Sequence, residues 1–348
     1  KHLLTWVFLK KKSNYIRIIV SNLQNIIHGV GIPFSALTSV IFGLMIVSFP
    51  LGAYAIFNSE IGDDIDYNFP LEKFDMFIAG VNIQLPLEYE IGDIFITLWS
   101  IFIILFVISF LGPKKNFMKN ISDILSNGKT SFSDNYMINI IKWFSILVLI
   151  SAVITIVQES FGIITQPPDT GNDLILFLQI SLAPITEEIG FRLILIGIPL
   201  FLIYSHKSSI KFFFKSLWNP YSNLHIYEKR KAIALIIGVG VFFGIAHVIS
   251  GEPWTEGKIL QASMGGIILG WVYFRYGLAA AIILHWATNY FIYSYLFLIS
   301  EINGISVQNA TTHSMIGTFE IILIISGIIS STMVFLNYKN SKKSIVQG

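Results

Sequence analysis

The chain has 348 residues, of which 54% are hydrophobic and 13% charged, with a formal net charge of +2 and a mean hydropathy of +0.69. Soluble domains are about 45–50% apolar and about 25% charged, so this composition excludes a disordered protein and a nucleic-acid-coating one. The chain has no cysteine, which excludes disulfides and thiolate metal sites. The composition therefore predicts a membrane protein.

Eight stretches are long and apolar enough to cross a bilayer, for which about 20 residues are needed. They are residues 31–57, 94–112, 143–165, 174–204, 232–250, 259–274, 278–300 and 321–338. We therefore predict an all-α fold, a polytopic transmembrane bundle of about eight spans. The stretch 174–204 is longer than one span requires, so it is either a steeply tilted helix or two helical pieces joined near Pro184.

The positive residues support this assignment. When alternate loops are placed on one side, only Lys73 and Lys258 fall on the other side, and Arg192 alone lies inside a span. Because cytoplasmic loops carry the excess of lysine and arginine, both termini are predicted to be cytoplasmic. The expected location is the membrane of a prokaryotic cell, in which the chain is a multi-pass integral protein.

The segments between the spans divide the chain into three predicted parts. Residues 1–142 hold an N-terminal interfacial segment, two spans and an acidic external loop over 58–93. Residues 143–300 form the catalytic membrane core. Residues 301–348 hold an external loop, the last span and a basic cytoplasmic tail. Alternating apolar residues over 77–87 fit either a small external β-hairpin or a solvated loop. The mixture of lysines and aromatics in His206–Lys231 predicts an amphipathic interfacial helix that contacts anionic lipid.

Ionisable residues inside the predicted spans are the informative feature of the sequence. Span 174–204 contains Glu187, Glu188 and Arg192. Each charged side chain near the centre of a span costs about 2.5–3.5 kcal/mol on the insertion scale. These groups must therefore be paired or hydrated in a cavity. Glu188 and Arg192 are four residues apart and can pair on one helix face, which leaves Glu187 without a cation from its own helix.

Two further spans contribute polar side chains. His247 ends one span, and His285 and Asn289 share a face of another because they are four residues apart. A carboxylate, two imidazoles and an amide from three helices can meet around one water molecule, and this set suits the hydrolysis of a peptide bond. A structural ion pair or a packing histidine would explain any one of these residues alone, but the joint pattern favours a site. Phe243 is interpreted as core packing.

The three motifs resemble those of a known family. Glu187-Glu188-x-x-x-Arg192, Phe243-x-x-x-His247 and His285-x-x-x-Asn289, in this order on successive hydrophobic segments, look like the motifs of the CAAX-protease and bacteriocin-processing (Abi, or Rce1-like) intramembrane endopeptidases. The resemblance covers about residues 174–295. It implies an eight-helix membrane hydrolase that cleaves near the C-terminus of membrane-tethered peptides, CAAX-like or otherwise lipid-associated.

The resemblance also implies roles, carried over by matching position. Glu187 would be the general base and His247 would help to activate the water. His285 and Asn289 would stabilise the oxyanion. The remaining two motif residues, which hold the others in place, would be Glu188 and Arg192.

This interpretation leaves open whether the site binds a metal ion, because the family is often labelled a metalloprotease. Glu187, His247 and His285 would suffice as zinc ligands with an open water position. The chain has no H-E-x-x-H pair, however, and these ligands would come from three helices. The residues favour a metal-independent glutamate mechanism and leave zinc as the alternative.

The expected partners are membrane lipids and a membrane-anchored peptide or protein substrate, with no nucleic acid; no oligomeric state is predicted. Two functions from other classes use the same residues. A proton- or ion-coupled transporter would employ the glutamates and histidines as a relay. A catalytically silent membrane scaffold or immunity-type protein would bind a partner within the bilayer.

Overall fold

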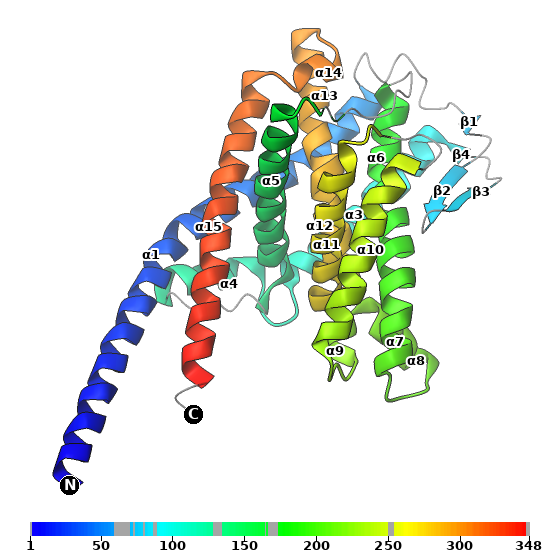
Figure 1. The fold of residues 1–348 in the computed structure, drawn as a ribbon. Coiled ribbons are helices and arrows are strands. Elements are labelled where there is room, and N and C mark those ends of the chain that lie inside the picture. The colour runs from blue at the N-terminus through cyan, green and yellow to red at the C-terminus, as the bar shows by residue number, and fades with distance from the viewer. Residues whose placement is uncertain are drawn as a thin grey trace.

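The structure, a computed structural model, describes residues 2–58, 70–71, 74–78, 81–85, 89–127, 134–163, 165, 173–249 and 254–345. Almost all of these residues are helical, which confirms the predicted all-α membrane bundle. Figure 1 shows both chain ends and the short helices α8 (Ile210–Trp218) and α9 (Pro220–Asn223) at one end of the bundle. The helix α14 (Val307–Ala310) lies at the other end, and the strands stand at the side of the bundle, toward that end.

Among the described residues, six helical stretches are long and apolar enough to cross a membrane. They are residues 24–57 of α1 (His2–Phe57), α3 (Ile91–Leu111), α5 (Tyr136–Ser160), α10 (Lys229–Ile249), residues 278–303, and residues 314–340 of α15 (Ser314–Ile345). The other two predicted spans, 174–204 and 259–274, are helical as well but are not among these six. The count of eight spans, the cytoplasmic termini and the three-part division of the chain stay predictions.

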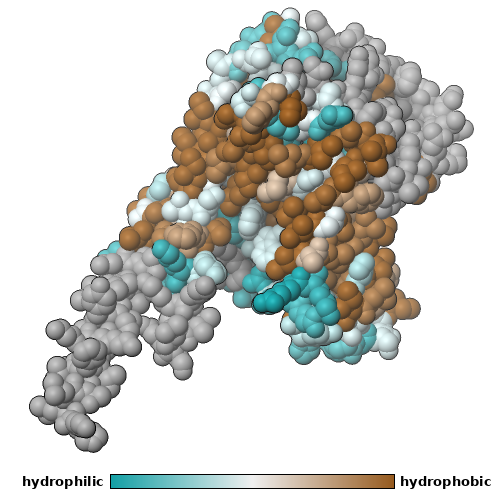
Figure 2. All heavy atoms as spheres, viewed as in Figure 1, coloured by the Kyte–Doolittle hydropathy of each residue, from teal (hydrophilic) through white to brown (hydrophobic). Residues whose placement is uncertain are grey.

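One face of the bundle carries an extended apolar surface (Figure 2). Figure 2 shows a hydrophobic band over the middle of this face, with hydrophilic residues gathered toward the ends. Large apolar side chains stand exposed on α3 and α10, among them Ile104 at 59% and Ile249 at 72%. In water such a surface would drive aggregation, whereas in lipid it is solvated. The protein is therefore an integral membrane protein.

The long stretch 174–204 is one continuous helical run rather than two pieces separated at Pro184. It consists of α6 (Asp173–Glu187), the π-helical segment η2 (Glu188–Gly197) and α7 (Ile198–Tyr204). A second π-helical segment, η3 (Ala287–Phe291), joins α12 (Leu278–Trp286) to α13 (Ile292–Asn303). Wide π turns are rare and often mark functional positions. Here both begin within two residues of a motif residue.

Glycines allow α10 to pack closely on α11 (Lys258–Tyr276). A Cβ atom at Gly266 would lie 2.8 Å from the carbonyl oxygen of Gly240, and a Cβ at Gly240 would lie 2.6 Å from the backbone nitrogen of Ile267. No side chain fits at either position. Small residues at such positions let membrane helices pack backbone to backbone.

The N-terminal helix α1 packs on the run that follows His285. The hydroxyl of Tyr290 donates to the carbonyl of Phe49 at 3.1 Å, and the hydroxyl of Tyr295 donates to the carbonyl of Leu44 at 2.9 Å. The ring of Phe49 also stacks on buried Trp286, with 4.9 Å between ring centroids. α1 therefore packs against η3 and α13 and holds them in place.

The small elements agree with two further predictions. β2 (Phe74–Ile78) and β3 (Val81–Leu85) form an antiparallel hairpin, and β1 (Pro70–Leu71) pairs with β4 (Tyr89–Glu90). The hairpin interpretation is confirmed, while its external location stays a prediction. In the segment predicted to be interfacial, α8 exposes Ile210, Phe214 and Trp218 along one face. The amphipathic helix α4 (Phe117–Asn127) contacts α1.

Candidate active site

A buried ion pair lies at the bottom of the site. The guanidinium Nη1 of Arg192 lies 3.0 Å from Oε1 of Glu188, and both side chains are at most 1% exposed. The pair has the predicted spacing of four residues, although η2 is π-helical. Two charges buried together are tolerated because each neutralises the other, and removal of either would leave an uncompensated charge.

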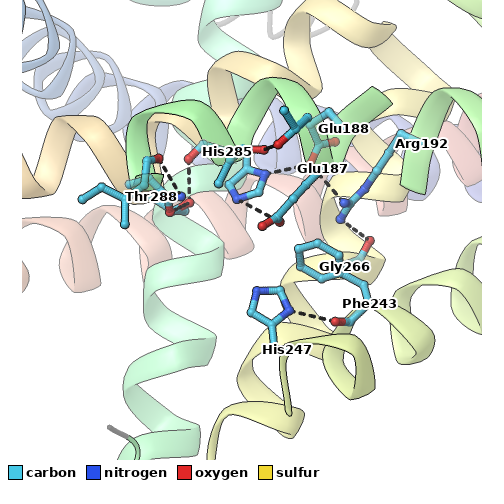
Figure 3. A network of polar contacts seen from close by, with 12 residues as sticks. Glu187, Glu188, Arg192, Phe243, His247, Gly266, His285 and Thr288 are labelled. Atoms are coloured by element: carbon cyan, nitrogen blue, oxygen red, sulfur yellow. Dashed lines mark hydrogen bonds and ion pairs between the residues drawn. The ribbon is translucent and has the colours of Figure 1, made fainter. Parts of the chain in front are cut away.

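Arg192 is also fixed by two groups from neighbouring helices. Its Nη2 donates to the carbonyl oxygen of Gly266 at 3.4 Å, and its guanidinium carbon lies 4.3 Å from the ring centroid of Phe243. The close approach of α10 to α11 brings Gly266 within reach. Arg192 therefore links η2 to both helices of this pair (Figure 3).

His285 lies between the two glutamates. Its Nδ1 is 2.8 Å from Oε1 of Glu188, and its Nε2 is 3.8 Å from Oε2 of Glu187 (Figure 3). Because a carboxylate oxygen only accepts, the proton on Nδ1 is donated to Glu188. The second nitrogen therefore faces Glu187.

The carboxylate of Glu187 is the member of this group that faces the cavity. Its Oε2 is buried and accepts no hydrogen bond from any residue that the structure describes. The 3.8 Å separation from His285 is too long for a direct hydrogen bond and suits a bridging molecule.

His247 approaches from α10. Its Nδ1 lies 2.8 Å from the carbonyl oxygen of Phe243, one turn earlier in the same helix. This contact places the proton on Nδ1 and leaves Nε2 as an acceptor. The ring of Phe243 lies against His247, with 4.6 Å between centroids, and 6.1 Å from His285. Phe243 thus separates His247 from the buried ion pair.

Asn289, the last predicted residue, is anchored to α6. Its Nδ2 donates to the carbonyl oxygen of Ile180 at 3.2 Å. The hydroxyl of Thr288 has a single hydrogen, which it donates to the carbonyl of His285 at 2.7 Å; Oδ1 of Asn289, 3.2 Å from the same hydroxyl oxygen, is the alternative acceptor. An amide nitrogen has two N–H groups, so the bond to Ile180 leaves one for another acceptor.

These residues line one cavity of about 710 Å³. Glu187, His247, His285 and Asn289 are in its wall, whereas Glu188 and Arg192 lie behind it. The rest of the wall comes mainly from α5, α6 and α11, with Glu320 from α15. A chamber of this size can hold several residues of a peptide.

Within the described part of the chain, no three His, Asp or Glu side chains are grouped as a metal ion would require. Zinc binding by Glu187, His247 and His285 and the metal-independent mechanism both stay predictions.

Several contacts were not predicted from the sequence. Phe243 was interpreted as packing; it is indeed buried, but it also contacts His247 and Arg192. Lys258 and Trp254 line the cavity although neither belongs to a motif. The signal available in the sequence was a lysine directly before the predicted span 259–274, four residues after a tryptophan.

The comparisons with known proteins agree with the motifs. A family model described as "Rce1-like: Type II CAAX prenyl endopeptidase Rce1-like" matches residues 171–291. This segment is similar to the Rce1-like family. The Rce1-like segment includes all three motifs, from Glu187 to Asn289, and confirms the resemblance read from the sequence. At the level of the family it supports a CAAX-type intramembrane protease. Neither the search of curated proteins nor the search of solved structures returned a match.

Proposed function

We propose that this protein is an intramembrane endopeptidase that hydrolyses a peptide bond near the C-terminus of membrane-tethered peptides. The observation that carries the proposal is the position of Glu187, whose carboxylate lies 3.8 Å from His285 in the wall of a cavity that His247 also lines. The Rce1-like segment favours this function over a transporter or a silent scaffold.

The first step is the activation of water. The carboxylate side chain of Glu187 is 16% exposed and lines the cavity, and Nε2 of His247 is an acceptor, so both residues can accept a hydrogen bond from a water in the cavity. Glu187 takes one proton of this water, and the oxygen attacks the carbonyl carbon of the substrate. The carbonyl π electrons move to its oxygen, which becomes the oxyanion.

The oxyanion is stabilised by donors from α12 and η3. The free N–H of Asn289 is one donor, and Nε2 of His285 is the second when that ring carries both protons. Glu188 supports the doubly protonated ring through its bond to Nδ1, and Arg192 holds Glu188. Removal of one oxyanion donor typically costs about 10²–10³ in kcat.

The tetrahedral intermediate then collapses. Its oxygen reforms the carbonyl, the C–N bond breaks, and the leaving nitrogen takes the proton that Glu187 accepted from water. Glu187 thus returns to its starting state, and the products are a carboxylic acid and an amine. No step requires a metal, and we propose a metal-independent glutamate mechanism.

The test is turnover of an S-farnesylated CAAX peptide by the purified protein in liposomes. Glu187→Gln keeps the size of the side chain but removes the base, so kcat/KM should fall by about 10²–10⁴. Glu159→Gln is the matched control, because Glu159 is an exposed glutamate of a membrane helix that does not line the cavity. Equal turnover by both variants and the unchanged protein would contradict the proposal.

A further inference from the structure

The cavity holds one positive side chain among the described residues that line it, Lys258 at the start of α11. Its ammonium nitrogen lies 3.7 Å from the ring centroid of Trp254, which lines the same cavity. The motif chemistry gives this lysine no role.

The packing of α10 against α11 places Lys258 near His247. Gly240 lies against Ile267 and Gly244 lies against Ser263, so the antiparallel register continues toward the end of α10. If this register is continued, Lys258 of α11 lies opposite Ile249 of α10, two positions after His247. At 1.5 Å per residue, that is about 3 Å along the helix axis from His247. The backbone N–H of Trp254 also donates to the carbonyl of His247 at 3.0 Å.

The described residues give Lys258 no anionic partner at contact distance. Their ion pairs, defined by a nitrogen–oxygen distance of up to 4.0 Å, do not include it. The other ionisable side chains of the cavity wall are Glu187, Glu320, His247, His285 and Tyr293. The tryptophan ring covers one side of the ammonium group and leaves its remaining N–H donors for a ligand.

We propose that Lys258, oriented by Trp254, binds the free C-terminal carboxylate of the peptide substrate. This inference rests on the proposed function, since cleavage near a C-terminus places that carboxylate close to the reacting bond. An extended peptide advances about 3.3–3.6 Å per residue, so a carboxylate a few residues beyond the bond lies on the order of 10 Å away. A cavity of about 710 Å³ can hold such a fragment between Glu187 and Lys258.

The experiment compares two S-farnesylated CAAX peptides that differ only at the end, where one has a free carboxylate and the other an amide. The binding of each peptide is measured with the full-length Glu187→Gln protein in liposomes. The cleavage of each peptide is measured with the unchanged protein. A charge-assisted bond to Lys258 should make the acid bind about tenfold to 100-fold more tightly than the amide. Lys258→Gln should abolish this preference without weakening the amide peptide, and Lys258→Arg should retain part of it.

Lys229→Gln is the matched control, since Lys229 is an exposed lysine at the first position of α10, outside the cavity wall. It should leave the preference unchanged. Equal binding of acid and amide to protein that retains Lys258 overturns the inference, even if both peptides are cleaved and the proposed function stands. A preference that depends on Lys258 without any cleavage supports the carboxylate site and contradicts the proposed function.

Discussion

The side-chain amide of Asn289 donates a hydrogen bond to the backbone carbonyl of Ile180 at 3.2 Å. Four residues after Ile180 stands Pro184, which has no N–H to donate to that carbonyl. Asn289 therefore supplies the donor that the proline removes. The bond fastens η3 to α6, so it positions Glu187 relative to His285 as well as leaving one amide hydrogen for the oxyanion.

Asn289→Ala should therefore affect both stability and activity. The part-buried carbonyl of Ile180 loses its donor, and the loss of such a hydrogen bond costs about 0.5–1.5 kcal/mol. We expect the free energy of unfolding in detergent to fall by that amount. The activity should fall as well, because the same change removes the oxyanion donor.

The proline allows the two effects to be separated. Pro184→Ala in the Asn289→Ala background restores a helical N–H for Ile180, so stability should recover while turnover stays low. Pro184→Ala alone serves as the control for the loss of the ring. If the double variant is no more stable than Asn289→Ala, the carbonyl of Ile180 is not the group that Asn289 satisfies.

Arg192→Met should be the more damaging change. The side chain is buried and pairs with Glu188 at 3.0 Å, so its loss leaves a carboxylate buried without its cation. Breaking one partner of a buried pair costs about 3–5 kcal/mol, a large part of the net stability of a typical domain. The measurement is the free energy of unfolding in detergent.

Arg275→Met is the comparison, because Arg275 is only partly buried and lies 3.9 Å from the ring of Tyr221. A contact of that kind contributes about 0.5–1 kcal/mol. Adding Glu188→Gln to Arg192→Met should recover part of the loss, since the unpaired charge is then removed. A similar loss from both arginines would show that the ion pair does not stabilise the site.

Residue spacing predicted much of the site. The four-residue interval between Glu188 and Arg192 indicated an ion pair, and the structure contains it. The pair forms although both residues lie in the π-helical segment η2. The close packing of α10 on α11 likewise depends on small residues that the sequence contains, Gly240 and Gly266.

Features set by contacts between helices could not be predicted. The π-helical turns after Glu187 and Trp286 change the rotation of each helix, and no residue pattern specifies them. The partner of Asn289 is a backbone carbonyl 109 residues away. Likewise, the proton position on His247 follows from its contact with Phe243. Each of these depends on tertiary packing.

Removal of metal ions should leave the peptidase active. The described residues form no group of three metal-ligating side chains, and Glu188 is held by Arg192. We expect kcat/KM for the farnesylated peptide to be unchanged after dialysis against a strong chelator, whereas a zinc peptidase treated in parallel should lose its activity. Loss of activity that added zinc restores would overturn the glutamate mechanism.

Access to the cavity can be mapped because the chain has no cysteine. Thr255 is exposed and next to Trp254 in the wall, whereas Ser208 is exposed beside Lys207, at the end of the bundle that carries the chain termini (Figure 1). The positive-inside rule predicts that Thr255→Cys is labelled by a membrane-impermeant maleimide in intact cells, and that Ser208→Cys is labelled only after permeabilisation. This pattern would mean that the substrate carboxylate reaches Lys258 from the external face. The reverse labelling pattern would place the termini outside and the mouth of the cavity in the cytoplasm, and the predicted orientation would be wrong.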